Sequence, residues 1–242
     1  KSTKNDKKTL KITKNHQFLN KTNFKYWQGY IGILIFVIFN TIAMLLYPGG
    51  TILDSNTEGY LFFYNYFSNL GEWTARNGEI NTVSAYLFNS SLIIFAISYF
   101  SFFISFIKLE LKAIKSKSLN AVLVLSIIIS LLSFVFIAVF SAEGGSIFFH
   151  MFFVKLAFRS LFIHSVAQTY VVFKIPEFDK FLSFASLGFT TILLLFLIIM
   201  DFGPSPHASQ NSLLIQVTAQ KVMVASIMIY FFFQIRTALR VS

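Results

Sequence analysis

The chain lacks cysteine and has few charged residues. None of its 242 residues is a cysteine, which excludes disulfides, thiolate metal sites and a cysteine nucleophile. Only 12% of the residues are charged, whereas a soluble domain has roughly 25%. Hydrophobic residues make up 55% of the chain, and 32 residues are phenylalanines. This composition predicts an integral membrane protein.

Long apolar runs fill most of the sequence. A helix needs roughly 20 residues to cross a bilayer, and these runs are continuously apolar rather than alternating as in a barrel strand. Clusters of glycine, proline and serine separate them. The six predicted spans are Gln28–Tyr47, Thr82–Ile107, Ala121–Phe140, Ile147–Phe173, Phe181–Met200 and Ser212–Ile235. We therefore expect an all-α, polytopic membrane protein with six transmembrane helices.

The basic residues that account for the net charge of +10 are unevenly placed. The segment Lys1–Lys25 holds eight lysines and one aspartate, and the loop after the second span and the C-terminus are also basic. The positive-inside rule then places both termini in the cytoplasm. We expect residues 1–25 to form a basic flexible cytoplasmic tail, and residues 26–242 a transmembrane domain with a structured external loop at 48–81. The tail suits anionic lipid headgroups. Without a folded basic module it does not indicate nucleic-acid binding.

The first external loop is unusually rich in aromatic and amide side chains. It contains the stretch NYFSNLG at Asn65–Gly71, followed by NTVSAYLFN at Asn81–Asn89, which enters the second span. Aromatic residues of this kind suit the membrane interface. The loop is therefore either a surface-lying cap on the bundle or a flap that closes over a pocket open to the outside.

These motifs carry a family resemblance. The matching positions are Asn65, Ser68, Leu70, Gly71, Asn81, Ser84, Leu87, Phe88, Asn89, His150, Gln220 and Lys221. The pattern resembles domain-of-unknown-function family 998, six-span prokaryotic proteins distantly similar to Frag1/DRAM/Sfk1-type membrane proteins. The resemblance implies a location in the prokaryotic cytoplasmic membrane and favours a role with lipids, without an established activity. Asn69 stands where the family usually has an acidic residue, which argues against a catalytic carboxylate there.

The fourth predicted span contains the stretch His150–His164, in which two cations interrupt an apolar run. Lys155 and Arg159 are four residues apart and share a helix face, while His164 and Gln168 return to within about 40° of His150 at about 100° per residue. Ionisable groups in hydrocarbon are costly and usually have a partner or a function. A helix with two polar faces is expected to lie at the centre of the bundle.

Three intramembrane cations, Lys155, Arg159 and Lys221, need anionic partners or a bound anion. One possibility is an internal network in which acids such as Glu143, Asp201 and Glu72 neutralise them. The other is an outward-opening pocket for the anionic headgroup of a membrane lipid or another amphiphile, since guanidinium suits phosphate and carboxylate. The predicted ligand-binding residues are Lys155, Arg159, Lys221, Gln220, Asn89 and His150.

A lipid-modifying enzyme is the main alternative, with His150, Asp201 and Glu143 as catalytic candidates. Together with His207 these residues could form a metal site at the outer rim, whereas His150 and His164 lie about 21 Å apart along a helix and cannot share a metal. The sequence contains no nucleophile elbow, phosphate-binding loop or dinucleotide fingerprint. We therefore expect no cofactor and no metal. A third possibility is an accessory subunit whose charges pair with a partner's helix, or a homo-oligomer.

Overall fold

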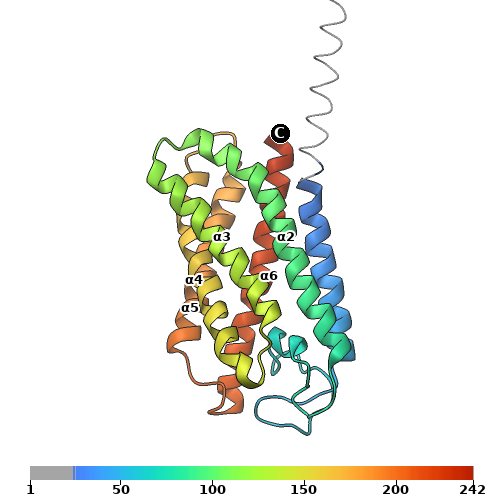
Figure 1. The fold of residues 1–242 in the computed structure, drawn as a ribbon. Helices are drawn as coiled ribbons and strands as arrows, with labels where there is room; N and C mark the ends of the chain where they lie inside the picture. Colours follow the sequence, from blue (N-terminus) through green and yellow to red (C-terminus); the bar gives the residue numbers. More distant parts are fainter. Residues whose placement is uncertain (1–23, 25, 242) are drawn as a thin grey trace, which may run out of the picture.

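The computed structural model describes residue 24 and residues 26–241, and this part of the chain is built from helices and loops without a β-strand. An unlabelled first helix, Tyr26–Leu46, precedes the others (Figure 1). The other long helices are α2 (Thr82–Ala113), α3 (Lys117–Val139), α4 (Ile147–Val172), α5 (Lys180–Phe202) and α6 (Gln210–Val241). All 6 are long and apolar enough to cross a membrane, which confirms the predicted six-span fold. The predicted basic tail, residues 1–25, lies almost entirely outside the described residues.

The connections divide between the two ends of the bundle. The C-terminus and the start of the first helix lie at one end, and loop 48–81 and the α3–α4 and α5–α6 turns lie at the other (Figure 1). At the end of the bundle that holds the termini, two side chains cap the first turns of their helices. Ser116 Oγ accepts from Leu119 N at the start of α3, and Asp179 Oδ1 accepts from Leu182 N at the start of α5. Having both termini at one end is the arrangement that the six-span topology requires, and the assignment of that end to the cytoplasm stays a prediction.

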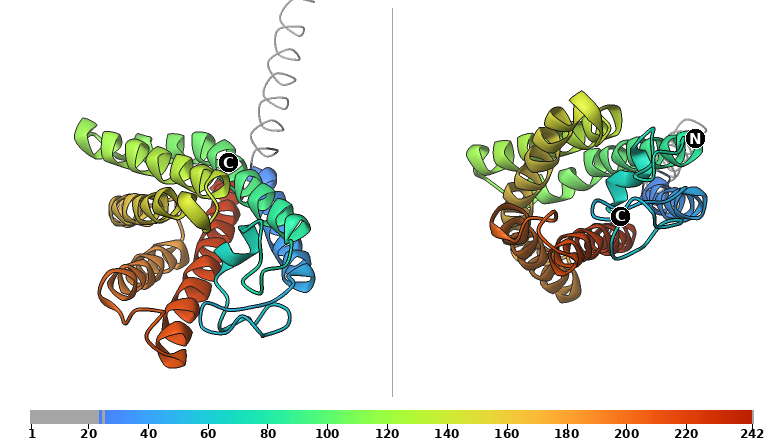
Figure 2. Two further views of the ribbon diagram at one scale, coloured as in Figure 1. Left: turned by 60° about the horizontal axis from the view of Figure 1, so that its bottom comes forward. Right: turned by 90° about the horizontal axis from the view of Figure 1, so that it is seen from below.

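Seen from the loop end, the helices form a ring, and loop 48–81 reaches across part of its centre (Figure 2). In this ring α4 lies at the perimeter between α3 and α5, so the expectation that α4 is central was wrong. The physical reason is that its two polar faces find partners on different neighbours. His164 and Gln168 point inward and are buried, while Arg159 bonds to Asp201 on α5.

Aromatic side chains fill much of the core. Phe102, Phe106 and Phe231 are fully buried, and the ring centroids of Phe102 and Phe231 lie 5.1 Å apart in an edge-to-face arrangement. Small residues bring the first helix close to α2, because a Cβ added at Gly32 would lie 2.4 Å from Ser98 Cβ. Such close contacts are a common way for membrane helices to associate. Packing of this kind holds the ring together around its interior.

Loop 48–81 is held by side-chain amides from the motif residues. Asn65 Nδ2 donates to Gly50 O at 2.7 Å, and Asn81 Nδ2 donates to Glu72 O at 2.7 Å. Ser84 Oγ donates to Leu70 O at 3.1 Å. Bonds of this type satisfy backbone groups that no strand or helix pairs. The motif residues therefore give the loop its shape.

The short 3-10 helix η1 (Phe67–Gly71) joins the loop to the bundle. Asn89 Nδ2 of α2 donates to Gly71 O at 3.3 Å, and a Cβ at Gly71 would lie 2.7 Å from Asn89 Oδ1. On the other side, Phe67 N donates to Gln220 Oε1 of α6 at 2.8 Å. These contacts fix η1 between α2 and α6, at the mouth of the ring.

Candidate functional site: a cavity at the loop end

A cavity of about 460 Å³ occupies the loop end of the ring. It lies within the usual size range of small-molecule sites, about 300–1,000 Å³. Its walls come from the first helix, α2, α3, α4, α5, α6 and loop 48–81, and its rim includes the exposed residues Pro204, Ser205 and His207 of the α5–α6 turn. The cavity therefore opens at the end of the bundle that holds loop 48–81.

The cavity wall is polar near the loop and apolar towards the bundle interior. Besides the rim, the polar wall residues include Ser68, Asn69, Arg76, His150, Gln216 and Gln220. Deeper in the ring the wall is made by Phe36, Leu92, Phe134 and Val224. A site with these two zones matches a molecule that has a polar end and an apolar end.

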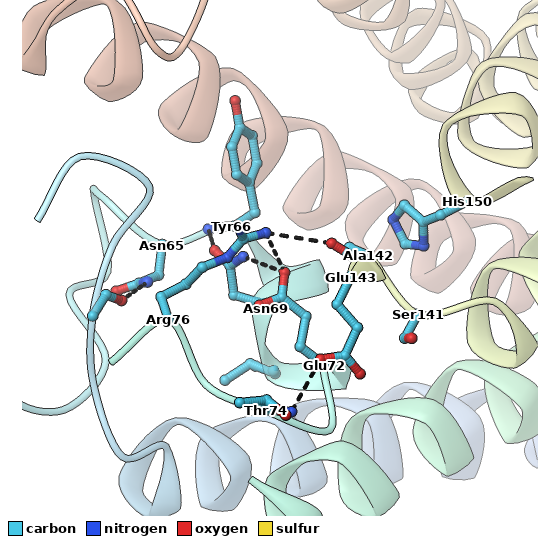
Figure 3. Close-up of polar contacts among 12 residues, drawn as sticks. Asn65, Tyr66, Asn69, Glu72, Thr74, Arg76, Ser141, Ala142, Glu143 and His150 are labelled. Atoms are coloured by element: carbon cyan, nitrogen blue, oxygen red, sulfur yellow. Dashed lines mark hydrogen bonds and ion pairs between the residues drawn. The ribbon is translucent and has the colours of Figure 1, made fainter. Parts of the chain in front are cut away.

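Arg76 is the charged residue of the cavity wall, and it is paired with the buried Glu72, which does not line the cavity (Figure 3). Arg76 Nη2 donates to Glu72 Oε1 at 2.5 Å and to Ala142 O at 3.4 Å. Arg76 Nε is buried and has no partner among the described residues. Both side-chain hydrogen bonds come from Nη2 and the side chain is 29% exposed, so an anionic or polar ligand atom could accept from the exposed edge of the guanidinium rather than from Nε.

The carboxyl group of Glu72 is only 1% exposed. Burial raises its pKa to about 7, and the neighbouring Arg76 and the hydrogen bond from Asn69 Nδ2 at 2.9 Å oppose that rise. Close to neutral pH this group therefore changes between a neutral acid and a carboxylate. The net charge of the Glu72–Arg76 pair rises when Glu72 takes up a proton.

Glu143 fastens loop 48–81 to the α3–α4 turn (Figure 3). Its Oε1 accepts from Trp73 N at 2.8 Å, and its Oε2 accepts from Thr74 N at 3.1 Å. Both backbone donors belong to loop 48–81. The carboxylate is committed to loop backbone rather than to an intramembrane cation.

His150 brings an imidazole from α4 to the cavity wall. Its Nδ1 lies 2.7 Å from Phe140 O. Because a carbonyl oxygen only accepts hydrogen bonds, Nδ1 carries the proton and Nε2 of the neutral ring is an acceptor. A ligand hydroxyl or a protonated acid could donate to that nitrogen.

The predicted ligand-binding cations lie elsewhere. Arg159 is 53% exposed, and its Nη2 donates to Asp201 Oδ1 and Oδ2 at 3.0 Å. Lys155 is half-buried and forms no salt bridge with a described residue. Of the predicted set, His150 and Gln220 line the cavity, and Lys155, Arg159, Lys221 and Asn89 are absent from its wall.

Lys221 lies in an aromatic cage that loop 48–81 forms over α6. Its Nζ is 3.7 Å from the ring centroid of Phe67, 4.6 Å from that of Tyr60 and 5.0 Å from that of Phe62. It also donates to the Tyr60 hydroxyl. Cation–π contacts are stronger in such desolvated surroundings. Lys221 therefore has a structural partner, although it is not a carboxylate.

The catalytic candidates are not gathered into one group. His150 bonds to Phe140, Asp201 to Arg159 and Glu143 to the loop backbone. Throughout the described residues, no three His, Asp or Glu side chains come together in a way that could hold a metal ion. Their present contacts are structural, and the enzymatic alternative stays a prediction.

The sequence analysis missed a polar network in the half of the bundle nearer the termini. It ended the second span at Ile107 and placed Glu110 in a loop, whereas α2 continues to Ala113 and Glu110 is 0% exposed. Glu110 Oε1 accepts from Gln168 Nε2 at 2.9 Å, and Gln168 Oε1 accepts from Tyr230 and Gln234 at 2.9 Å each. The signal that could have found it is spacing: Gln168 shares a face with His164, and Tyr230 lies four residues before Gln234.

Comparison with known proteins leaves the family open: no protein-family model, curated protein or solved structure matches the chain. The resemblance to family 998 and its implied prokaryotic location therefore stay predictions. What the fold establishes is a helical bundle with the length and composition of an integral membrane protein.

Proposed function

We propose that the protein binds an anionic lipid or another anionic amphiphile in the cavity at the loop end. The observation that carries the proposal is the cavity wall with its two zones. Arg76, His150 and Gln220 lie near the loop, and Phe36, Leu92 and Phe134 lie deeper in the ring. The polar end of the ligand would lie against Arg76, and its apolar part would enter the ring.

The position of Arg76 supports an anionic rather than a neutral polar end. Arg76 lines the cavity, its side chain is 29% exposed, and its hydrogen bonds to Glu72 and Ala142 both come from Nη2. A phosphate or carboxylate oxygen could accept a charge-assisted hydrogen bond from the exposed edge of the guanidinium. His150 adds an acceptor at the same wall, which would orient the ligand.

The arrangement also provides a way in. The exposed turn Gly203–His207 forms part of the rim, and loop 48–81 forms the opposite part. An amphiphile from the adjacent leaflet would reach the cavity at this end. If the positive-inside assignment holds, that leaflet is the outer one.

Mass spectrometry of co-purified lipids tests the proposal. The native protein, Arg76→Gln, Arg76→Lys and the matched control Arg159→Gln would be purified in a non-ionic detergent and extracted. We expect an anionic amphiphile enriched over bulk membrane lipid in the native protein and in Arg159→Gln. It should be strongly reduced in Arg76→Gln and partly retained in Arg76→Lys, which keeps the charge.

Equal enrichment in Arg76→Gln and Arg159→Gln would overturn the assignment of Arg76. A native protein whose co-purified lipids only mirror the bulk membrane would overturn the proposed function itself. Hydrogen exchange of residues 61–81 in each variant would show whether the loop remains folded, so that a lost ligand is not confused with a lost loop.

A further inference from the structure

A second, smaller cavity of about 70 Å³ lies deeper in the ring. Its wall includes Ala96, Leu131, Leu161 and Ile227, which do not line the outer cavity. Four residues line both spaces: Phe36, Leu92, Phe134 and Val224. The two cavities are therefore neighbours along the bundle, separated only by a collar of apolar side chains.

The inner cavity ends at the polar network but has an apolar surface. Gln168 and Gln234 line it, yet their amide atoms bond to Glu110, Tyr230, Tyr99 and each other. What they turn towards the cavity is mainly carbon. The network closes the cavity at this end, because separating polar groups that are hydrogen-bonded to one another would be unfavourable.

Water is a poor occupant of this space. A buried water typically makes about three hydrogen bonds. Among the described wall residues, the one buried polar side-chain atom without a partner is Nε2 of His164. One acceptor does not hold a chain of waters, so the inner cavity suits hydrocarbon.

We propose that the inner cavity receives the tail of the amphiphile whose anionic end lies at Arg76, so that the ligand is a long, single-chain amphiphile. This inference rests on the proposed function and names its ligand class. From His150 at the outer cavity to His164 at the inner one is about 21 Å along α4, at 1.5 Å per residue. A short chain would end in the outer cavity, and only a long one would pass the collar.

The collar explains how such a chain would be selected. Phe36, Leu92, Phe134 and Val224 approach the axis from the first helix, α2, α3 and α6. A single acyl chain is narrow enough to pass between side chains that change rotamer, whereas a second chain on the same headgroup would have to stay in the outer cavity. Chain length should therefore affect affinity more than headgroup size does.

Equilibrium binding of octanoate, dodecanoate and hexadecanoate to the full chain in non-ionic detergent tests the inference. Affinity, expressed against the free aqueous ligand, should rise at least about tenfold from dodecanoate to hexadecanoate in the native protein, because each buried methylene adds to the hydrophobic driving force. Ala96→Phe, which fills the inner cavity alone, should bind octanoate normally and lose that rise. Ile97→Phe, on the lipid-facing side of the same turn, is the matched control and should keep it.

Ile227→Phe provides a second, milder filling variant should Ala96→Phe fail to fold. Hexadecanoate bound with native affinity by both filling variants would overturn the inner tail site. Equal affinity of the native protein for all three acids would overturn it as well, while leaving the outer anion site standing. Failure of the native protein to bind any of them would instead count against the proposed function.

Discussion

The two polar regions of the bundle differ in how their groups are satisfied. At the loop end, polar side chains come from loop 48–81 and from helix ends, and part of the Arg76 guanidinium is exposed beside a large cavity. In the other half, Tyr99, Gln168, Tyr230 and Gln234 come from three different helices and bond to one another. Polarity within the membrane is therefore not by itself a sign of a ligand site. Exposed polar groups beside open volume are the better sign, because Glu110 Oε2 and His164 Nε2 in the interior half also have no partner but are buried.

The two regions also differ in how their charged side chains are paired. The three salt bridges among the described residues, Arg76–Glu72, Arg159–Asp201 and Arg240–Asp179, all lie at helix ends, in the loop or on the exposed surface. Glu110, the acid in the interior network, is bonded to an amide instead. An unpaired carboxylate is very costly in low dielectric, and Glu110 Oε2 has no partner among the described residues.

The largest expected effect follows from removing the centre of the interior network. Gln168→Leu deletes three hydrogen bonds and leaves Glu110, Tyr230 and Gln234 short of a buried partner. At roughly 1 kcal/mol for each buried group, we expect a loss of about 3 kcal/mol in unfolding free energy. Thermal unfolding in detergent measures it. Gln210→Leu, at the exposed start of α6, is the control, and a loss no greater than that of the control would contradict the network's role.

The next effect is a pH dependence at the loop. The pKa of Glu72 is about 7 in the folded loop, above its ordinary value of 4.5. The stability that this group adds is therefore complete below about pH 4.5 and is lost as pH rises through 7. The loss is on the order of 3 kcal/mol, since each unit of the difference between 4.5 and about 7 is worth about 1.4 kcal/mol. Hydrogen exchange of loop 48–81, corrected for intrinsic pH effects, measures it.

Glu72→Gln is the control for this pH dependence. The variant should show the same loop protection at pH 5 and pH 8. If its loop opens with pH as steeply as that of the native protein, another group is responsible. The same titration bears on ligand binding, because a protonated Glu72 no longer competes for Arg76, so an anionic ligand should bind more tightly as pH falls towards 6.

A smaller effect is expected where Glu143 joins the loop to the α3–α4 turn. Glu143→Ala removes two hydrogen bonds to Trp73 N and Thr74 N. We expect a local loss of about 1.5 kcal/mol, because both bonds are exposed to solvent. Exchange of these two amides should accelerate about tenfold, with the helices unaffected. Unchanged exchange at Trp73 and Thr74 would show that the rest of the loop suffices to hold them.

The smallest effect is expected at the surface ion pair. Arg159 is 53% exposed, and its bond to Asp201 should contribute at most about 1 kcal/mol. Arg159→Gln should therefore lower the unfolding temperature only slightly. A large loss would indicate that the pair is shielded in the membrane and would blur the contrast between surface and interior charges.

The sequence predicted the helices well, because six apolar runs of sufficient length can satisfy their backbones in a membrane only as helices. The second span was predicted too short, since Lys108 and Glu110 read as loop residues. In the structure α2 continues through both residues, and Glu110 is held there by a hydrogen bond from Gln168 of α4. The local sequence does not predict a helix end that is stabilised by contacts with another helix.

The candidate site was only partly predictable. The loop motif pointed to the correct end of the bundle, and His150 and Gln220 line the cavity there. Arg76 was overlooked because its charge sits in a loop, where a cation needs no explanation. Arg159 attracted attention because its charge sits in a span, and its partner Asp201 is 42 residues away. Pairing across helices decides which cation is left open to a ligand.

Comparing hexadecanoate affinity in Arg76→Gln and Arg159→Gln tests the central claim, that the loop-end cavity binds the anionic end of an amphiphile through Arg76. Both changes remove one guanidinium from the same protein. The account predicts at least about tenfold weaker binding for Arg76→Gln, equivalent to about 1.4 kcal/mol, and binding within about twofold of native for Arg159→Gln. Native affinity in Arg76→Gln, or the larger loss in Arg159→Gln, would contradict it.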